Sequence, residues 1–291
     1  MEGIILKGIG GFYYVDTGDQ VIECKPRGIF RKQGQIPVAG DYVTLLINAD
    51  NTAVIESIKE RKNMLVRPPV ANVDCLVMVI SMAQPVPNLQ IVDTMLAVAE
   101  SKDIEAVIVI NKSDLANADE IGAIYEKAGY TVYIVSAKEN TGLQELKDYV
   151  SGKVCVFTGN TGVGKSSILN LLDPSLDLKT GETSQKLGRG RHTTRTSILY
   201  PQKEGGYLID TPGFSSLTVE KLADITPEEL PYCFREFEPF LGTCKFTSCQ
   251  HIHEKGCAVC EALEMGKIEP SRYESYENLL EITKKNNSIY N

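Results

Sequence analysis

The stretch Gly159-Asn160-Thr161-Gly162-Val163-Gly164-Lys165-Ser166 fits the phosphate-binding loop pattern G-x-x-x-x-G-K-S/T at every fixed position. An apolar, β-rich run at residues 153–158 precedes it, and helical spacing follows it over residues 166–172. Such a loop requires this context, because its backbone N–H groups and the helix N-terminus together bind phosphate oxygens. The sequence therefore predicts a nucleoside triphosphate site in an α/β domain, rather than a chance glycine-rich turn.

Two side chains of this loop have distinct predicted roles. Lys165 is expected to act in catalysis by reaching the β and γ phosphates, and Ser166 is expected to ligand Mg²⁺. The other predicted nucleotide contacts of the loop are Gly159, Asn160, Thr161, Gly162, Val163, Gly164 and Ser167.

A second motif, Asn111-Lys112-Ser113-Asp114, matches the N-K-x-D sequence with which GTPases recognise guanine. The Asp114 carboxylate would accept hydrogen bonds from the guanine N1–H and N2 amino groups, and adenine offers no such pair of donors. The aliphatic stem of Lys112 would cover the base plane. Ser136-Ala137-Lys138 would present backbone N–H groups to the guanine O6. Alone the motif is a weak signal, but beside a phosphate-binding loop it indicates GTP.

Strands and helices alternate from Asp74 onward, which predicts a parallel α/β sheet with ligand-binding loops at the carboxyl ends of its strands. The expected strands are residues 75–81, 104–110 and 131–135, and the expected helices are residues 91–102 and 118–128.

A third motif completes the set in an unusual order. Asp210-Thr211-Pro212-Gly213, after expected strands near residues 197–200 and 206–209, matches D-x-x-G. Asp210 would hold Mg²⁺ through water, and the Gly213 N–H would meet the γ-phosphate. Ordinary GTPases place the phosphate-binding loop before N-K-x-D, whereas here it follows. The domain is therefore predicted to be circularly permuted, which a fold tolerates when its original termini lie close together.

The first 68 residues contain short β-rich runs separated by turns, at residues 12–15, 21–24, 41–47 and 53–58. They predict a small β-barrel, for which the five-stranded, oligonucleotide-binding OB-fold is one candidate. Its basic side chains either bind RNA or form a solvated face, and the sequence leaves both interpretations open. These side chains are Lys25, Arg27, Arg31, Lys32, Lys59, Arg61, Lys62 and Arg67.

The composition is that of an ordinary multidomain globular protein: 291 residues, 43% hydrophobic and 23% charged. The net charge of −8 argues against non-specific nucleic-acid binding, although a local basic surface can still bind RNA. There is no long apolar run and no basic, apolar leader at the N-terminus, so we expect a cytoplasmic protein without a membrane partner.

Taken together, these motifs resemble the circularly permuted, ribosome-associated GTPases of the RsgA (YjeQ/YloQ) family, over essentially the whole chain. The resemblance implies a multidomain fold: an all-β OB-fold barrel that binds RNA at residues 1–68, an α/β permuted GTPase domain at 69–218, and an α-helical zinc-binding module at 219–291. It also implies GTP hydrolysis in late maturation of the small (30S) ribosomal subunit. The subunit and its rRNA would be partners bound in a nucleotide-dependent way, and the subunit would stimulate the GTPase. We expect a monomer.

A cysteine cluster near the C-terminus agrees with the zinc pattern of that family. The predicted ligands of one zinc ion are Cys244, Cys249, His251 and Cys257. Three thiolates and an imidazole suit tetrahedral zinc, and four protein ligands leave no open position, so the metal would be structural. Cys260 and His253 remain candidates, and the residues alone do not rank Cys257 above Cys260. Packed thiols without a metal are the other interpretation. Residues 270–285 are expected to form an amphipathic helix against this module.

The sequence lacks the glutamine that usually orients the attacking water in GTPases. Phe214 follows Gly213, where many GTPases carry a glutamine, and its ring cannot hydrogen-bond water. His192 is the leading internal candidate, with an RNA or structural contact as the alternative, and Thr194 is expected to ligand Mg²⁺. Two functions therefore stay open: a subunit-stimulated GTPase, or a nucleotide-gated RNA-binding scaffold with vestigial turnover.

Overall fold

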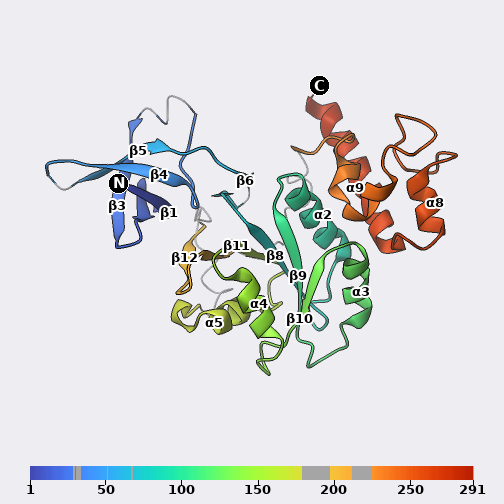
Figure 1. Cartoon of the computed structure of the whole chain (residues 1–291), viewed down its shortest axis with the longest axis horizontal. Coiled ribbons are helices and arrows are strands. Elements are labelled where there is room, and N and C mark those ends of the chain that lie inside the picture. The colour runs from blue at the N-terminus through green and yellow to red at the C-terminus, as the bar shows by residue number, and fades with distance from the viewer. Residues whose placement is uncertain are drawn as a thin grey trace. The chain divides into compact units, whose positions relative to one another are not determined.

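The computed structural model describes residues 1–28, 30, 34–50, 52–66, 68–178, 197–211 and 224–290. For residues 288–290 it describes the backbone only. The described residues form two compact units. Their helices and strands are labelled in Figure 1. One contains the N-terminal barrel with β11, β12 and β13, and the other contains β8, β9, β10, α2, α3 and the C-terminal helices. Within the described ranges, no helix is both long enough and apolar enough to cross a membrane.

The N-terminal strands close into a barrel in the order β1-β2-β3-β5-β4, which confirms the predicted OB-fold. They are β1 (Glu2–Ile9), β2 (Phe12–Asp16), β3 (Val21–Pro26), β4 (Tyr42–Ile47) and β5 (Ala53–Ile58). Among these five barrel strands, only β3 and β5 pair in parallel. The strand β1 was not predicted, because Ile4, Ile5 and Leu6 are all buried and so lack the alternation expected of a strand. A register shift between Ile5 and Lys7 accommodates this run.

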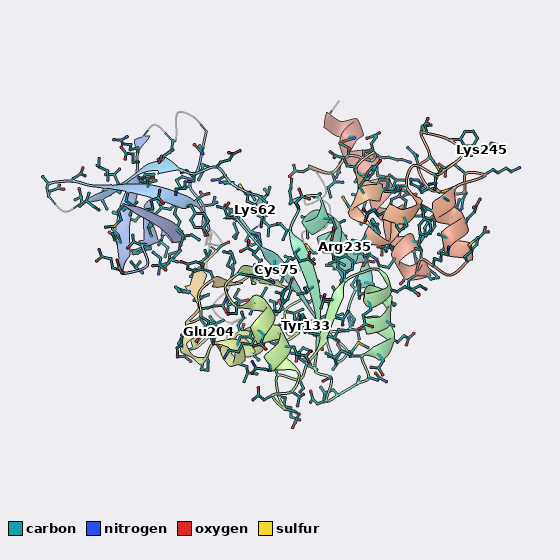
Figure 2. The ribbon with its side chains drawn as sticks, in the orientation of Figure 1. Lys62, Cys75, Tyr133, Glu204, Arg235 and Lys245 are labelled. Carbon is teal, nitrogen blue, oxygen red and sulfur yellow. The ribbon has the colours of Figure 1, made fainter. Side chains whose placement is uncertain are left out.

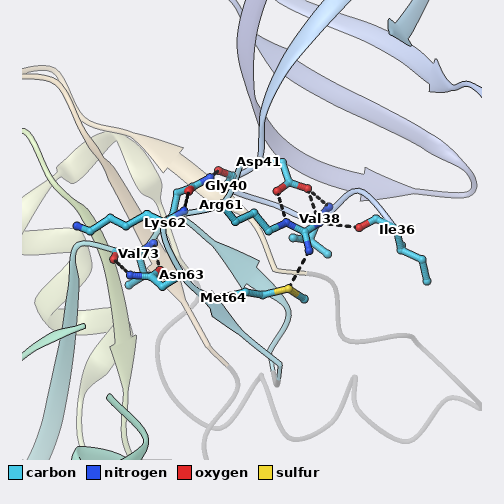
Figure 3. A network of polar contacts seen from close by, with 10 residues as sticks. Ile36, Val38, Gly40, Asp41, Arg61, Lys62, Asn63, Met64 and Val73 are labelled. Atoms are coloured by element: carbon cyan, nitrogen blue, oxygen red, sulfur yellow. Dashed lines mark hydrogen bonds and ion pairs between the residues drawn. The ribbon is translucent and has the colours of Figure 1, made fainter. Parts of the chain in front are cut away.

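Buried polar contacts hold the segment that leads from the barrel to β8 (Cys75–Ser81), where Lys62 and Cys75 are labelled in Figure 2. Figure 3 shows the Arg61 guanidinium donating to both carboxylate oxygens of Asp41, at 2.7 and 2.9 Å. Asp41 is fully buried. Asn63 exchanges two hydrogen bonds with the backbone of Val73, at 2.9 and 2.8 Å. Arg61 therefore fixes the segment to the barrel, and Asn63 holds the two ends of the segment together.

The GTPase-type sheet has the strand order β10-β9-β8-β11-β13-β12. Beyond β8, its strands are β9 (Glu105–Asn111), β10 (Thr131–Ile134), β11 (Val154–Thr158), β12 (Leu199–Pro201) and β13 (Tyr207–Asp210). β9 with β10 and β11 with β13 pair in parallel, as predicted. The edge strand β12, predicted near residues 197–200 without a direction, pairs antiparallel to β13. A tight turn containing Gly205 and Gly206, both with positive φ, joins these strands, and so short a connection can only link antiparallel neighbours.

The helices follow the predicted spacing, with one addition to the GTPase part. They are α2 (Leu89–Glu100), α3 (Asp119–Lys127), α4 (Leu143–Val150), which was not predicted, and α5 (Lys165–Leu172). The C-terminal part contains the 3₁₀ turns η3 (Leu230–Cys233) and η4 (Arg235–Phe240) and the helices α8 (Ala258–Glu264) and α9 (Pro270–Tyr290). The amphipathic helix is confirmed, since Tyr276, Leu279 and Leu280 of α9 are completely buried.

Candidate nucleotide site and metal centre

The phosphate-binding loop lies between the end of β11 at Thr158 and the start of α5 at Lys165. Gly159, Gly162 and Gly164 adopt φ values of 145°, 87° and 98°, a region that side chains with a Cβ rarely adopt. A Cβ on Gly159 would overlap the carbonyl oxygen of Val79. The glycine pattern read from the sequence is therefore required by the backbone and by its neighbours.

Lys165 lies with its ammonium group against its own loop. Its Nζ donates to the carbonyl oxygens of Gly159 at 2.8 Å and Asn160 at 3.0 Å. A phosphate group is a stronger, charged acceptor than a carbonyl, so it would compete for this ammonium group.

Asn111 links two loops of the predicted nucleotide site. Its Nδ2 donates to the Val163 carbonyl at 2.8 Å, and its Oδ1 accepts from the Ala137 N–H at 3.0 Å. Only 2% of the side chain is exposed. Asn111 therefore ties the phosphate-binding loop to the Ser136–Lys138 loop and positions both. Lys112, with φ of 64°, donates from Nζ to the Gln84 carbonyl at 2.6 Å.

Asp114 is oriented by two neighbours from the loop after β10. The Ser136 hydroxyl donates to its Oδ1 at 2.7 Å, and the Lys138 Nζ lies 3.7 Å from its Oδ2. The hydrogen bond from Ser136 is the main cause that lowers the pKa of Asp114. The ionised carboxylate is purely an acceptor, as recognition of the two guanine donors requires.

Ser166, a predicted Mg²⁺ ligand, lies beside Asp210, which is predicted to hold Mg²⁺ through water. The Ser166 Oγ donates to Asp210 Oδ2 at 3.2 Å. A hydroxyl and a carboxylate are hard oxygen ligands, so this pair fits the Mg²⁺ that the GTPase family implies with GTP. Thr211 holds the end of β13 next to Asp210, because its Oγ1 donates to the Phe157 carbonyl of β11 at 2.8 Å.

Several predicted residues lie outside the described ranges. They are the catalytic candidates His192 and Thr194, the γ-phosphate contact Gly213, the neighbouring Phe214, and the basic residues Arg31, Lys32 and Arg67.

The C-terminal cluster has the geometry of a tetrahedral metal site. The ligand atoms of Cys244, Cys249, His251 and Cys257 all lie within 4.8 Å of one another. The thiols of Cys244 and Cys257 are 3.9 Å apart, and the His251 Nδ1 lies 3.5 and 3.4 Å from them. Tetrahedral zinc, with Zn–S of about 2.3 Å and Zn–N of about 2.0 Å, would place sulfurs about 3.8 Å apart and sulfur and nitrogen about 3.5 Å apart. The donor set therefore fits zinc.

The surroundings of the cluster also suit a ligand role. Burial lowers the pKa of His251 and so favours the neutral imidazole, the form that binds metals. The Tyr273 hydroxyl donates to the His251 carbonyl at 2.7 Å. The backbone N–H of Cys260 points at the Cys257 sulfur, at 3.5 Å, and such bonds orient a thiolate ligand.

The two spare ligand candidates lie outside this cluster. The His253 imidazole is 83% exposed, and its Nε2 is 3.7 Å from Glu277. The Cys260 thiol lies 3.6 Å from the Tyr273 hydroxyl. Because Cys257 is the N-cap of α8, it is the backbone N–H of Cys260 that meets the Cys257 sulfur.

Sequence reasoning missed the contact that docks the C-terminal module on α2. Arg272 of α9 donates to Asp93 of α2 at 2.7 Å and to Glu236 of η4 at 2.7 and 3.1 Å. These side chains are 1%, 1% and 4% exposed. No local pattern marks them, because each is a residue type that usually lies on the surface.

In this chain the N-K-x-D loop precedes the phosphate-binding loop, an order that defines the class of circularly permuted GTPases. An OB-fold barrel and a Cys/His cluster flank the GTPase part. Two family models match: one described as "RsgA GTPase" over residues 58–220, and one described as "RsgA N-terminal domain" over residues 2–55. The chain belongs to the RsgA GTPase family.

Relatives of similar length support this assignment. The "Small ribosomal subunit biogenesis GTPase RsgA" of Caldanaerobacter subterraneus is 46% identical, with 98% of this chain and 96% of that protein covered. The protein of the same name from Alkaliphilus metalliredigens is 43% identical, with 98% of both covered.

Two solved structures share the fold. The crystal structure of YjeQ from Thermotoga maritima matches with a TM-score of 0.81 and 36% identity, over 97% of this chain and 98% of that one. The structure of "YloQ, a circularly permuted GTPase" matches with a TM-score of 0.79 and 37% identity, over 98% and 95%.

Proposed function

We propose that this GTPase acts in late maturation of the small (30S) ribosomal subunit, binding it in a nucleotide-dependent way and hydrolysing GTP faster when bound. The observation that carries the GTP assignment is the Asp114 carboxylate, which accepts a hydrogen bond from Ser136 on a loop that Asn111 ties to the phosphate-binding loop. The names of the relatives support the subunit as partner.

Within this function, Lys165 contacts the β and γ phosphates, and Ser166 and Asp210 hold Mg²⁺, Asp210 through water. Bound Mg²⁺ neutralises charge that develops on the phosphates. Lys112 covers the guanine base, and the Ser136-Ala137-Lys138 loop meets its O6. The loop amides from Gly159 to Ser167 surround the phosphates.

Three residues complete the proposed site on sequence grounds. The Gly213 N–H meets the γ-phosphate, Thr194 adds a Mg²⁺ ligand, and His192 orients the attacking water. Because Phe214 cannot take that last role, we expect slow hydrolysis without the subunit.

The proposed division of labour follows the domains 1–68, 69–218 and 219–291. The barrel contacts rRNA through its basic side chains, and the C-terminal module is stabilised by one structural zinc held by Cys244, Cys249, His251 and Cys257. We propose that the protein works as a cytoplasmic monomer.

Guanine recognition is tested by Asp114→Asn. An amide offers guanine a donor where it needs an acceptor, so affinity for GTP should fall and affinity for XTP should rise. Ser113→Ala, at the variable position of the motif, is the matched control and should bind both as the wild type does. Unchanged GTP and XTP affinities in Asp114→Asn would contradict the assignment.

The subunit function is tested by measuring GTP hydrolysis with and without purified small subunits. A rate increase on adding subunits supports the stimulated enzyme, whereas equal rates favour the scaffold with vestigial turnover. Titrating labelled subunits with protein in GDP or in a non-hydrolysable GTP analogue tests the nucleotide dependence. We expect tighter binding with the analogue, by a factor of about 5 to 150, the usual range of coupling between sites.

A further inference from the structure

Tyr207, the first residue of β13, contacts the barrel directly. Its hydroxyl donates a hydrogen bond to Asp16 Oδ2 at 3.0 Å, between residues 191 positions apart in the chain. Asp16 ends β2, and its Oδ1 accepts from the Gly18 N–H at 2.9 Å, so the turn after β2 orients the carboxylate. Burial and the hydrogen bond to Asp16 raise the pKa of Tyr207.

A second contact holds the neighbouring strand β11, at the residue that pairs with Tyr207. Asp74, at the end of the segment fixed to the barrel, donates its N–H to the Val154 carbonyl and accepts the Val154 N–H on Oδ2, both at 2.9 Å. Val154 is the residue of β11 that pairs with Tyr207 of β13. The barrel and its connecting segment therefore hold one end of the β11–β13 ladder.

The opposite end of that ladder carries Asp210, which is proposed to hold Mg²⁺ through water. The register runs from Val154 opposite Tyr207 to Phe157 opposite Asp210. Asp210 accepts from Ser166 at 3.2 Å. The three residue steps from Tyr207 to Asp210 span only about 10 Å. Because β13 is hydrogen-bonded to strands on both sides, a displacement of Tyr207 is transmitted to Asp210 rather than absorbed within the strand.

We infer that Tyr207 is a positioning residue for GTP hydrolysis: by binding Asp16, it couples the barrel's engagement with the small subunit to the placement of Asp210. A barrel held by the subunit holds Tyr207, and β13 then holds the Asp210 carboxylate beside Ser166. The inference rests on the proposed function, since it explains how binding at the barrel stimulates the GTPase.

The test is the stimulation factor, the ratio of GTP hydrolysis rates with saturating small subunits and without subunits. Tyr207→Phe removes only the hydroxyl and should lower this factor about tenfold, within the usual range of coupling. Asp16→Ala should do the same, and the stimulation factor of the double variant should fall no further, because both changes break the same Tyr207–Asp16 hydrogen bond. Asp16→Asn keeps a polar partner for the phenol and should retain more stimulation than Asp16→Ala.

Two readouts separate positioning from a merely structural role. The subunit concentration for half-maximal stimulation should not change in Tyr207→Phe, whereas the Mg²⁺ concentration for half-maximal stimulated hydrolysis should rise. The matched control is Tyr14→Phe, which removes a tyrosine–carboxylate hydrogen bond, to Glu23, that stays within the barrel. This control should keep the full stimulation factor at saturating subunits.

The outcomes distinguish the inference from the function on which it rests. Full stimulation in Tyr207→Phe, or additive losses in the double variant, overturns the inference and leaves the proposed function standing. Absence of stimulation in the wild-type chain overturns the proposed function, and the inference with it.

Discussion

The C-terminal module and the barrel are attached to the GTPase strands and helices in opposite ways. The module docks on α2 through Arg272, Asp93 and Glu236, of which at most 4% of any side chain is exposed. The barrel side combines the two Asp74–Val154 hydrogen bonds and a part-buried tyrosine hydrogen bond with the Lys62–Asp74 pair, whose side chains are 59% and 39% exposed. Removing one partner of a buried ion pair costs several kcal/mol, whereas exposed pairs contribute little. The difference indicates a fixed, fully buried attachment for the module and a partly exposed one for the barrel.

Aromatic rings add to the fixed attachment. The Arg272 guanidinium lies 4.7 Å from the centroid of the Phe234 ring and 5.6 Å from that of Tyr130. Phe234 in turn meets Tyr276 edge-on, with ring centroids 5.3 Å apart. These contacts stabilise the desolvated cation, so the module has little freedom to move on α2.

The largest expected effect comes from the proposed zinc site, on the module side of the comparison. Cys257→Ser should release the metal and unfold α8 and its surroundings, because structural zinc contributes on the order of 10 kcal/mol to small modules. Metal content and hydrogen exchange across α8 and α9 are the measurements. Cys260→Ser is the matched control and should keep one zinc per chain. A full complement of zinc in Cys257→Ser would contradict the ligand set.

Arg272→Met tests the fixed attachment itself. Asp93 and Glu236 would be left buried without a cation, which should lower the free energy of unfolding by about 3–5 kcal/mol. Denaturant unfolding monitored by hydrogen exchange of α2 and α9 measures this. The control is Lys127→Met, which removes the partly exposed pair with Glu269 and should cost less than about 1 kcal/mol. Equal effects of the two changes would remove the distinction.

Asn63→Ala is expected to have a smaller effect, on the barrel side. It removes both hydrogen bonds to the Val73 backbone, whose buried N–H and carbonyl then lack these partners, at a cost of about 1–3 kcal/mol. Asn48→Ala, in an exposed turn of the barrel, is the comparison and should cost less. The free energies of unfolding of the two variants measure the difference.

The smallest expected effect is that of Lys62→Met. The ammonium group lies 3.1 Å from Asp74 Oδ1, but both side chains are well exposed, so the loss should stay below about 1 kcal/mol and shrink further at high salt. Unfolding at low and high ionic strength gives the measurement. A loss approaching that of Arg272→Met would remove the distinction between the buried and the exposed pair.

The parts of the fold that sequence predicted are those with a strong local pattern. The apolar run of β8, the glycines of the phosphate-binding loop and the turns of the barrel carry their conformation in neighbouring residues. The edge strand β12 was predicted near residues 197–200, but its antiparallel direction was not, because strand direction depends on pairing partners rather than on periodicity. The C-terminal helix was predicted but extends further, to Tyr290.

Alone, the sequence determined the permuted order of the GTP motifs and the cysteine and histidine set, because each is a short run whose chemistry depends on residue type and spacing. Only the tertiary structure decided which residues meet: Asn111 with Val163, Cys257 rather than Cys260 in the cluster, Arg272 with Asp93, and Tyr207 with Asp16. Except at the cluster, these partners lie 52 or more positions apart in the chain. Their contact depends on how strands and helices pack, and no local pattern encodes that packing.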